Sequence, residues 1–253
     1  MRRTMAFISA LLVTLAVSAR EEDVLAQMDE YLAAMDHLTI ADASEEADFM
    51  ISCVTDSSLR SAVAEKAYNH FRYSKVMGSE NVAIHIFDRW FATFDTVFGN
   101  IDDFDEAQFY AFVNRQSLIG VKGKTIALLN RDGEKISIPF TNGRKAVIYF
   151  YSTFCPKCLY TSTKLCELFK NLNPELDFFA VYTGENEQEW EEYQSRNLDI
   201  RSDSTAVYHL RSGDEDFVVA YGVIQTPRLF LLDEEGIITG RNLDADALSK
   251  LLR

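Results

Sequence analysis

Two cysteines three residues apart, Cys155 and Cys158, are the residues of this sequence best suited to covalent chemistry. They follow an unbroken apolar and aromatic run at 146–151, which predicts a strand buried on both faces. From Pro156 the apolar residues recur at helical spacing, and proline is favoured in a first helical turn. We therefore expect Cys155 at a helix N-terminus, where free N–H groups and the helix dipole stabilise a thiolate. Cys158 follows one turn later, so the pair is predicted to be a redox dithiol.

Other roles for this cysteine pair stay open. Zinc would need two further ligands, but Cys53 and Cys166 are isolated and the four histidines do not cluster, so no metal is expected. A purely structural disulfide between Cys155 and Cys158 would close a very tight loop. Cys53 and Cys166 are expected to be small buried residues, and a bridge between them is the alternative.

The composition and the first residues indicate an exported globular protein. The chain has 253 residues, 47% of them hydrophobic, which is enough for one large domain or two small ones. Its formal net charge of −14 argues against a nucleic-acid partner. Arg2 and Arg3 precede an apolar stretch at 5–17 and small residues at 17–19, as in a cleaved signal peptide. We predict a signal peptide at 1–19 and a periplasmic location, where disulfides can persist.

Residues 20–118 are predicted to form a helical domain. Apolar residues there recur three or four apart, and Asp56 precedes one such segment as a capping residue. A helix is expected at 82–94, with an apolar stripe formed by four residues: Val82, Ile86, Trp90 and Phe94.

Residues 119–253 are predicted to form an α/β domain, because strands and helices alternate there. An Asp-Gly turn predicts a β-hairpin at 125–140, and further strands are expected at 176–182, 228–232 and 237–239. The remaining segments are predicted to be helical: 187–196, 205–210, 216–221 and 245–252.

Residues 120–253 resemble a thioredoxin fold of the exported TlpA/ResA-like branch. The resemblance rests on the hairpin, on the Cys-Pro-Lys-Cys motif at the strand-to-helix turn, and on Tyr-Gly-Val-Ile-Gln-Thr-Pro at 221–227. The helical part is similar to the region preceding thioredoxin domains in envelope proteins of the Bacteroidota. The fold class implied is an α/β thioredoxin fold after a mostly α-helical N-terminal domain.

The resemblance also implies roles for individual residues. Cys155 would be the attacking thiol and Cys158 the resolving thiol. Thr226 and Pro227, with a cis bond between them, would be the edge that docks a peptide. Lys157, after Pro156, would favour the thiolate of the pair, unless its side chain simply points into water.

This chain departs from the family at three positions. Tyr149 stands where thioredoxin has a buried Asp, Thr161 where this branch often has Glu, and Phe154 where Trp is usual. The buried acid is a general base for the resolving thiol, so its absence leaves the route of that proton unassigned and puts fast reductase activity in doubt.

The function that these features predict is that of an exported thiol–disulfide oxidoreductase without a cofactor. Its expected partners are disulfide-bearing envelope proteins and a membrane-linked electron donor. A peroxidase is a weaker alternative, because Ile148 stands where the peroxiredoxin motif has proline. A further alternative is a binding module, in which the helical domain captures a partner and the thioredoxin fold is a scaffold.

Overall fold

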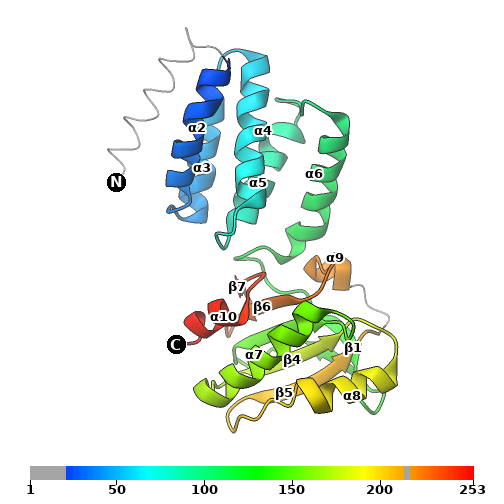
Figure 1. Ribbon diagram of the computed structural model, residues 1–253. Coiled ribbons are helices and arrows are strands. Elements are labelled where there is room, and N and C mark those ends of the chain that lie inside the picture. The colour runs from blue at the N-terminus through cyan, green and yellow to red at the C-terminus, as the bar shows by residue number, and fades with distance from the viewer. Residues whose placement is uncertain (1–20, 214–216) are drawn as a thin grey trace. The chain divides into compact units, whose positions relative to one another are not determined.

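The computed structural model describes residues 21–213 and 217–253, so the predicted signal peptide lies outside the described residues. The chain divides into two compact units, the first ending at Phe112 and the second beginning at Val113 (Figure 1). The sequence places the boundary a little later, at residue 118. The difference arises because a short 3-10 helix, η2 (Arg115–Ser117), packs against α9 (Phe217–Tyr221) of the second unit. Of the helices described, none is both long and apolar enough to cross a bilayer.

The first unit is helical, and polar side chains cap the beginnings of two of its helices. Asp56 accepts a hydrogen bond from the backbone N–H of Leu59 at 2.8 Å, as its capping role predicts. Thr39 caps the helix that begins at Ile40 in the same way, accepting a hydrogen bond from the backbone N–H of Asp42 at 3.1 Å. The elements are α2 (Glu21–Met35), α3 (Ile40–Ser52), α4 (Ser57–Tyr73), α5 (Ser79–Ile86), the π-helix η1 (Phe87–Phe91) and α6 (Ile101–Asn114), whose last two residues belong to the second unit.

The helix predicted at 82–94 is interrupted. It continues from α5 into the five-residue π-helix η1, in which each turn holds more residues than in an α-helix. Val82, Ile86 and Trp90 are buried, but Phe94 is 76% exposed and has a left-handed backbone with φ of 61°. The prediction that Phe94 extends the buried stripe is therefore wrong, because the π turn changes the face on which later residues lie.

The second unit is built on a seven-stranded mixed sheet in the order β2-β1-β5-β4-β3-β6-β7. β3, β4 and β5 are parallel to one another, and the other neighbouring strands pair antiparallel. The strands are β1 (Ile126–Leu129), β2 (Lys135–Ile138), β3 (Ala146–Tyr151), β4 (Asp177–Tyr182), β5 (Ala206–Arg211), β6 (Arg228–Leu232) and β7 (Ile238–Gly240). The helices are α7 (Pro156–Leu172), α8 (Glu187–Asn197), α9 (Phe217–Tyr221) and α10 (Ala245–Leu251).

Strand β5 corrects the prediction that residues 205–210 are helical. It pairs in parallel with β4 over its whole length, and Leu129 of β1 pairs with its last residue. Val207 and Tyr208 are residues favoured in strands. The segment is short and most of its residues are half-buried, so buried and exposed positions do not alternate clearly along it. Pairing with the buried strand β4 decides its conformation.

Strand β3 positions the dithiol and divides the core. All six of its residues are buried, as the apolar run predicts. Val147, Tyr149 and Tyr151 face a core cluster that includes residues of α7, α8 and α10. Ile148 and Phe150 face the opposite cluster, which includes residues of α9. The sheet is thus covered on both faces, and the alternate residues of β3 lie directly under α7.

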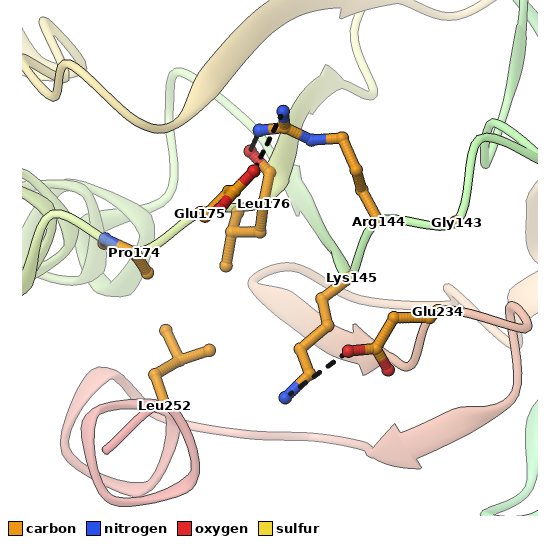
Figure 2. A pocket seen from close by; sticks show the side chains of 8 residues that line it. All are labelled: Gly143, Arg144, Lys145, Pro174, Glu175, Leu176, Glu234 and Leu252. Carbon is orange, nitrogen blue, oxygen red and sulfur yellow. Dashed lines mark hydrogen bonds and ion pairs between the residues drawn. The ribbon is translucent and has the colours of Figure 1, made fainter.

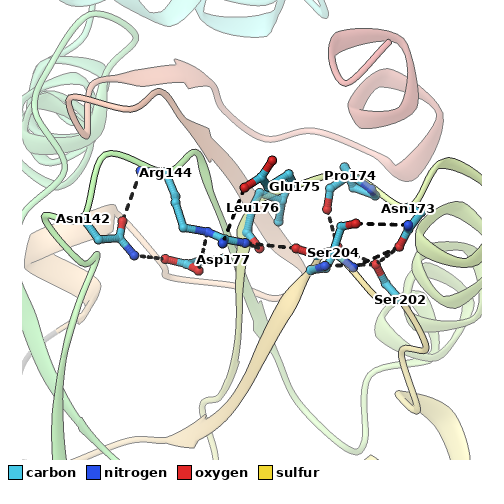
Figure 3. A network of polar contacts seen from close by, with 10 residues as sticks. Asn142, Arg144, Asn173, Pro174, Glu175, Leu176, Asp177, Ser202 and Ser204 are labelled. Carbon is cyan, nitrogen blue, oxygen red and sulfur yellow. Dashed lines mark hydrogen bonds and ion pairs between the residues drawn. The ribbon is translucent and has the colours of Figure 1, made fainter.

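The amino ends of the central strands are held by a polar network (Figure 3). Asp177 is buried, and Arg144 lies 3.2 Å from its carboxylate, while Asn142 donates to the other oxygen at 2.7 Å. Arg144 also donates to the carbonyl oxygens of Leu176 and Ser204. The network ties the turn before β3 to β4 and to the segment before β5, at the end of the strands opposite the dithiol.

Candidate active site

The dithiol lies where the buried strand β3 gives way to α7. Cys155 is the residue immediately before the helix, with an extended backbone (φ −90°, ψ 111°), and Pro156 occupies the first helical position. The backbone carbonyl of Cys155 accepts a hydrogen bond from the N–H of Leu159 at 3.1 Å. The local structure predicted for this turn is confirmed. The free N–H groups of the first turn of α7 are consequently directed at the Cys155 side chain.

Both cysteines of the pair are free thiols, and they differ in environment. Cys155 is half-buried, whereas Cys158 is fully buried. The backbone N–H of Cys158 donates to the sulfur of Cys155 at 3.2 Å, which is the contact expected of an N-capping thiolate. Cys155 is therefore the thiol that a substrate can reach, and Cys158 lies behind it.

The surroundings shift the pKa values of the two thiols in opposite directions. Burial by itself would raise the pKa of Cys155, but hydrogen bonds from the Cys158 thiol and from the backbone N–H groups of Cys158 and Lys157 lower it below its ordinary value. Burial, followed by the hydrogen bond with Cys155, raises the pKa of Cys158 to about 11. The pair thus combines a thiol whose pKa is lowered with one that keeps its proton near neutral pH.

A second segment, the loop before the neighbouring strand β6, completes the site. The peptide bond between Thr226 and Pro227 is cis, as the resemblance implies. The Cys155 thiol donates a hydrogen bond to the carbonyl oxygen of Thr226 at 3.4 Å. The structure therefore brings Cys155, Cys158 and the Thr226–Pro227 edge together, although 71 residues separate Cys155 from Thr226.

A groove of about 640 Å³ runs beside the dithiol. Pro156, Lys157, Thr226 and Pro227 all line it, together with residues of the loop before α10. The Lys157 side chain is exposed. Tyr160, which also lines the groove, is 66% exposed, and two further large apolar side chains close in sequence to the dithiol or to Pro227 are exposed, Phe154 (79%) and Ile224 (54%). Such a groove can hold an extended, partly apolar peptide next to Cys155.

The sequence analysis did not single out Ser162 and Tyr193, whose hydroxyls are linked to Cys158 through Tyr149. The Tyr149 hydroxyl, noted in the sequence only as a departure from the family, donates to the Cys158 carbonyl oxygen at 2.9 Å and lies 3.1 Å from the Ser162 hydroxyl. Ser162 lies 3.0 Å from the Tyr193 hydroxyl on α8. The position of Ser162, one helical turn after Cys158 on the same helix, was a usable signal. For Tyr193 there was none, because only the packing of α8 against α7 brings it there.

The other two cysteines are free thiols as well. Cys166 is half-buried on α7, with its sulfur 3.7 Å from the carbonyl oxygen of Asn197, and burial raises its pKa to about 11. Cys53, in the first unit, is also half-buried, so neither is as fully buried as predicted. In the part of the chain that the structure describes, no three His, Cys, Asp or Glu side chains converge as a metal site would need.

A second pocket, of about 410 Å³, lies near the amino ends of β3 and β4 (Figure 2). Its charged groups are engaged with one another: Lys145 lies 3.9 Å from Glu234, and Arg144 lies 3.8 Å from Glu175. No sulfur lines it. It is separate from the dithiol, which lies at the carboxyl end of β3.

Comparisons with known proteins agree with this fold. A family model described as thioredoxin-like matches residues 143–238. The crystal structure of a thioredoxin-like protein from Bacteroides caccae superposes with a TM-score of 0.66 at 16% identity, over 93% of this chain and 85% of the other. No match was found among curated protein sequences.

Two further similar structures carry the name thiol-disulfide oxidoreductase. The thioredoxin domain of one from Bacteroides vulgatus has a TM-score of 0.46 at 16% identity, over 53% of this chain and 98% of that one. One from Bacteroides fragilis has a TM-score of 0.44 at 18% identity, over 52% and 96%.

Residues 143–238 thus form a thioredoxin-like domain, which confirms the resemblance recognised in the sequence. The fold is that of an α/β thioredoxin-like unit preceded by helices.

Proposed function

We propose that this protein is an exported thiol–disulfide oxidoreductase that acts on protein disulfides through Cys155 and Cys158. The observation that carries the proposal is the position of Cys155. Its sulfur accepts the Cys158 N–H at the start of α7 and lies 3.4 Å from the Thr226 carbonyl at the cis Thr226–Pro227 edge. A lowered pKa at the accessible thiol supplies the thiolate that disulfide exchange requires.

The reaction proceeds in two exchanges. The Cys155 thiolate attacks one sulfur of a substrate disulfide, forming a mixed disulfide and releasing the other substrate sulfur as a thiolate. Cys158 then loses its proton and attacks Cys155, so that the Cys155–Cys158 bond forms and the second substrate thiolate leaves. The substrate gains two electrons and the dithiol loses them. In reverse the same steps oxidise a substrate dithiol.

The groove suggests how a substrate chain is held. An extended segment beside Pro227 would lie in the groove against Tyr160 and Lys157, next to the half-buried thiol of Cys155. Disulfide-bearing envelope proteins are the proposed substrates, and a membrane-linked donor would return electrons to the pair. These partners and the periplasmic location rest on the signal-peptide pattern at 1–19.

The test is a redox titration of the purified protein against a glutathione series. The fraction of the Cys155–Cys158 pair that is reduced is measured by thiol alkylation and mass spectrometry. The proposal expects a reversible two-electron transition within the range of known Cys-X-X-Cys proteins, roughly −270 to −120 mV. A pair that never closes, or never opens under strong reductant, would overturn it in favour of a binding module on the same fold.

A further inference from the structure

A chain of three buried hydroxyl groups leads to the backbone of Cys158. Tyr149 of β3 and Ser162 of α7 are completely buried, and Tyr193 of α8 is 6% exposed. The Tyr149 hydroxyl lies 2.9 Å from the Cys158 carbonyl oxygen, Ser162 lies 3.1 Å from Tyr149, and Tyr193 lies 3.0 Å from Ser162. We call these three groups the hydroxyl chain.

The direction of each hydrogen bond in the hydroxyl chain is set by the carbonyl oxygen of Cys158, at which the chain ends. A carbonyl oxygen can only accept, so the single proton of the Tyr149 hydroxyl points at Cys158. Ser162 must then donate to Tyr149, and Tyr193 must donate to Ser162. All three O–H dipoles are consequently directed towards Cys158, with their positive ends leading. Such an arrangement favours negative charge near Cys158 and restrains the helical turn that carries it.

The hydroxyl chain is neutral and cannot act as the missing base. Burial raises the pKa of Tyr149 far above its ordinary value, and burial likewise raises the pKa of Tyr193 to about 12. The other titratable groups facing Cys158 are Cys155 and Tyr151. The carboxylate of Glu189 on α8 accepts a hydrogen bond from the Thr153 hydroxyl in the turn before α7, at 3.3 Å. No carboxylate hydrogen-bonds to Cys158 among the described residues, so we take water as the acceptor of its proton in the second exchange.

We propose that Tyr149, held by Ser162 and Tyr193, is a positioning residue for the resolving thiol Cys158. This inference rests on the proposed function, because it concerns the second exchange of that reaction. In that step the Cys158 proton passes to solvent, and the sulfur–sulfur bond to Cys155 forms. The bond between Cys155 and the substrate sulfur breaks, and the substrate leaves as a thiolate. The hydroxyl chain stabilises the Cys158 thiolate without taking its proton, where thioredoxin uses a buried acid.

The test separates the two exchanges. Reduced protein is mixed with glutathione disulfide, quenched with acid at intervals, and analysed by mass for the mixed disulfide and for the closed pair. Tyr149→Phe removes only the hydroxyl at the end of the chain. In this variant the rate at which the mixed disulfide is resolved should fall about fivefold, which is the effect of losing one hydrogen bond. The midpoint of the pH profile of that rate should rise. The rate of the first attack on glutathione disulfide should change less than twofold. Ser162→Ala, which interrupts the chain, should slow resolution in the same direction.

Tyr68→Phe is the control. Tyr68 is a fully buried tyrosine of α4 in the first unit, and its hydroxyl has no hydrogen-bond partner among the described residues. The rate of the first attack and the rate of resolution should both stay at the wild-type values in this variant. The inference is overturned if Tyr149→Phe and Ser162→Ala resolve like the wild type, or if Tyr68→Phe slows resolution equally. A wild-type protein that forms no mixed disulfide at all contradicts the proposed function itself, and this inference with it.

Discussion

The Cys155 thiol lies against the carbonyl oxygen of Thr226, at 3.4 Å, in the residue that precedes the cis proline. Cys155 follows the turn after the central strand β3, and Thr226 lies in the loop before the neighbouring strand β6. These strands are antiparallel neighbours, with Phe150 opposite Arg228. The pairing of β3 with β6 therefore places the nucleophile at the proposed docking edge.

Replacing the resolving thiol should trap the intermediate. In Cys158→Ser, glutathione disulfide should leave a stable adduct on Cys155, because no second thiol lies behind it to release the glutathione. The adduct is detected as added mass that dithiothreitol removes, and its position is found by peptide mapping. Cys155→Ser is the control and should form no adduct at this site. An adduct that maps instead to Cys166 in Cys158→Ser would contradict the assigned roles.

Alkylation rates should distinguish the cysteines. At pH 7 Cys155 should react with iodoacetamide at least about tenfold faster than Cys158 or Cys166, because only the thiolate reacts and the pKa is lowered at Cys155 and raised at the other two. As the pH rises towards 11 the difference should narrow. Rates are followed by mass spectrometry of each peptide. Equal rates at pH 7 would show that the start of α7 does not activate Cys155.

His209, on β5, should make the protein sensitive to acid. Burial, and then the charge of Arg131, lowers its pKa to about 4. Between pH 6.5 and 4 the unfolded chain therefore takes up a proton that the folded protein does not, so the free energy of unfolding falls as the pH falls, by about 2 to 3 kcal/mol in all. Urea unfolding of His209→Gln should show a shallower fall over this range. His37→Gln, at an exposed histidine, should keep the wild-type slope.

Removing Arg144 should destabilise the domain without changing the dithiol. Arg144→Ala leaves the buried carboxylate of Asp177, whose side chain is 3% exposed, without its charge partner, and should lower the free energy of unfolding by about 3 kcal/mol. Arg201→Ala removes an exposed ion pair with Asp199 and should lower the free energy of unfolding far less than Arg144→Ala does. The reduction potential should stay at the wild-type value in both. A changed potential in Arg144→Ala would show that the two ends of β3 are coupled.

Much of the site could be predicted because its signals are local. The apolar run at 146–151 has only one reasonable place, the middle of a sheet, and it forms β3 as predicted. Pro156 and the helical spacing after it mark the start of α7, and this makes Cys155 the residue before the helix. The confirmed cis bond before Pro227 came from the resemblance, which rests on motifs far apart in the chain.

The predictions that were wrong, a helix at 205–210 and a buried Phe94, concern features that the local sequence pattern does not reveal. Residues 205–210 lack a clear period of their own and become β5 because β4 offers a buried partner. The π turn at η1 rotates Phe94 away from the buried side of the helix, and no residue type in that segment indicates a π turn.

The sequence by itself determined the dithiol, the buried strand before it and the helix that begins at it, since neighbouring residues dictate each of these. Only the tertiary structure decided what surrounds the two sulfurs. Tyr149, Ser162 and Tyr193 come from three different elements, and their hydroxyls meet because α7 and α8 pack on one face of the sheet. A residue that looks in the sequence like a missing acid is, in the folded protein, a hydrogen-bond donor to Cys158.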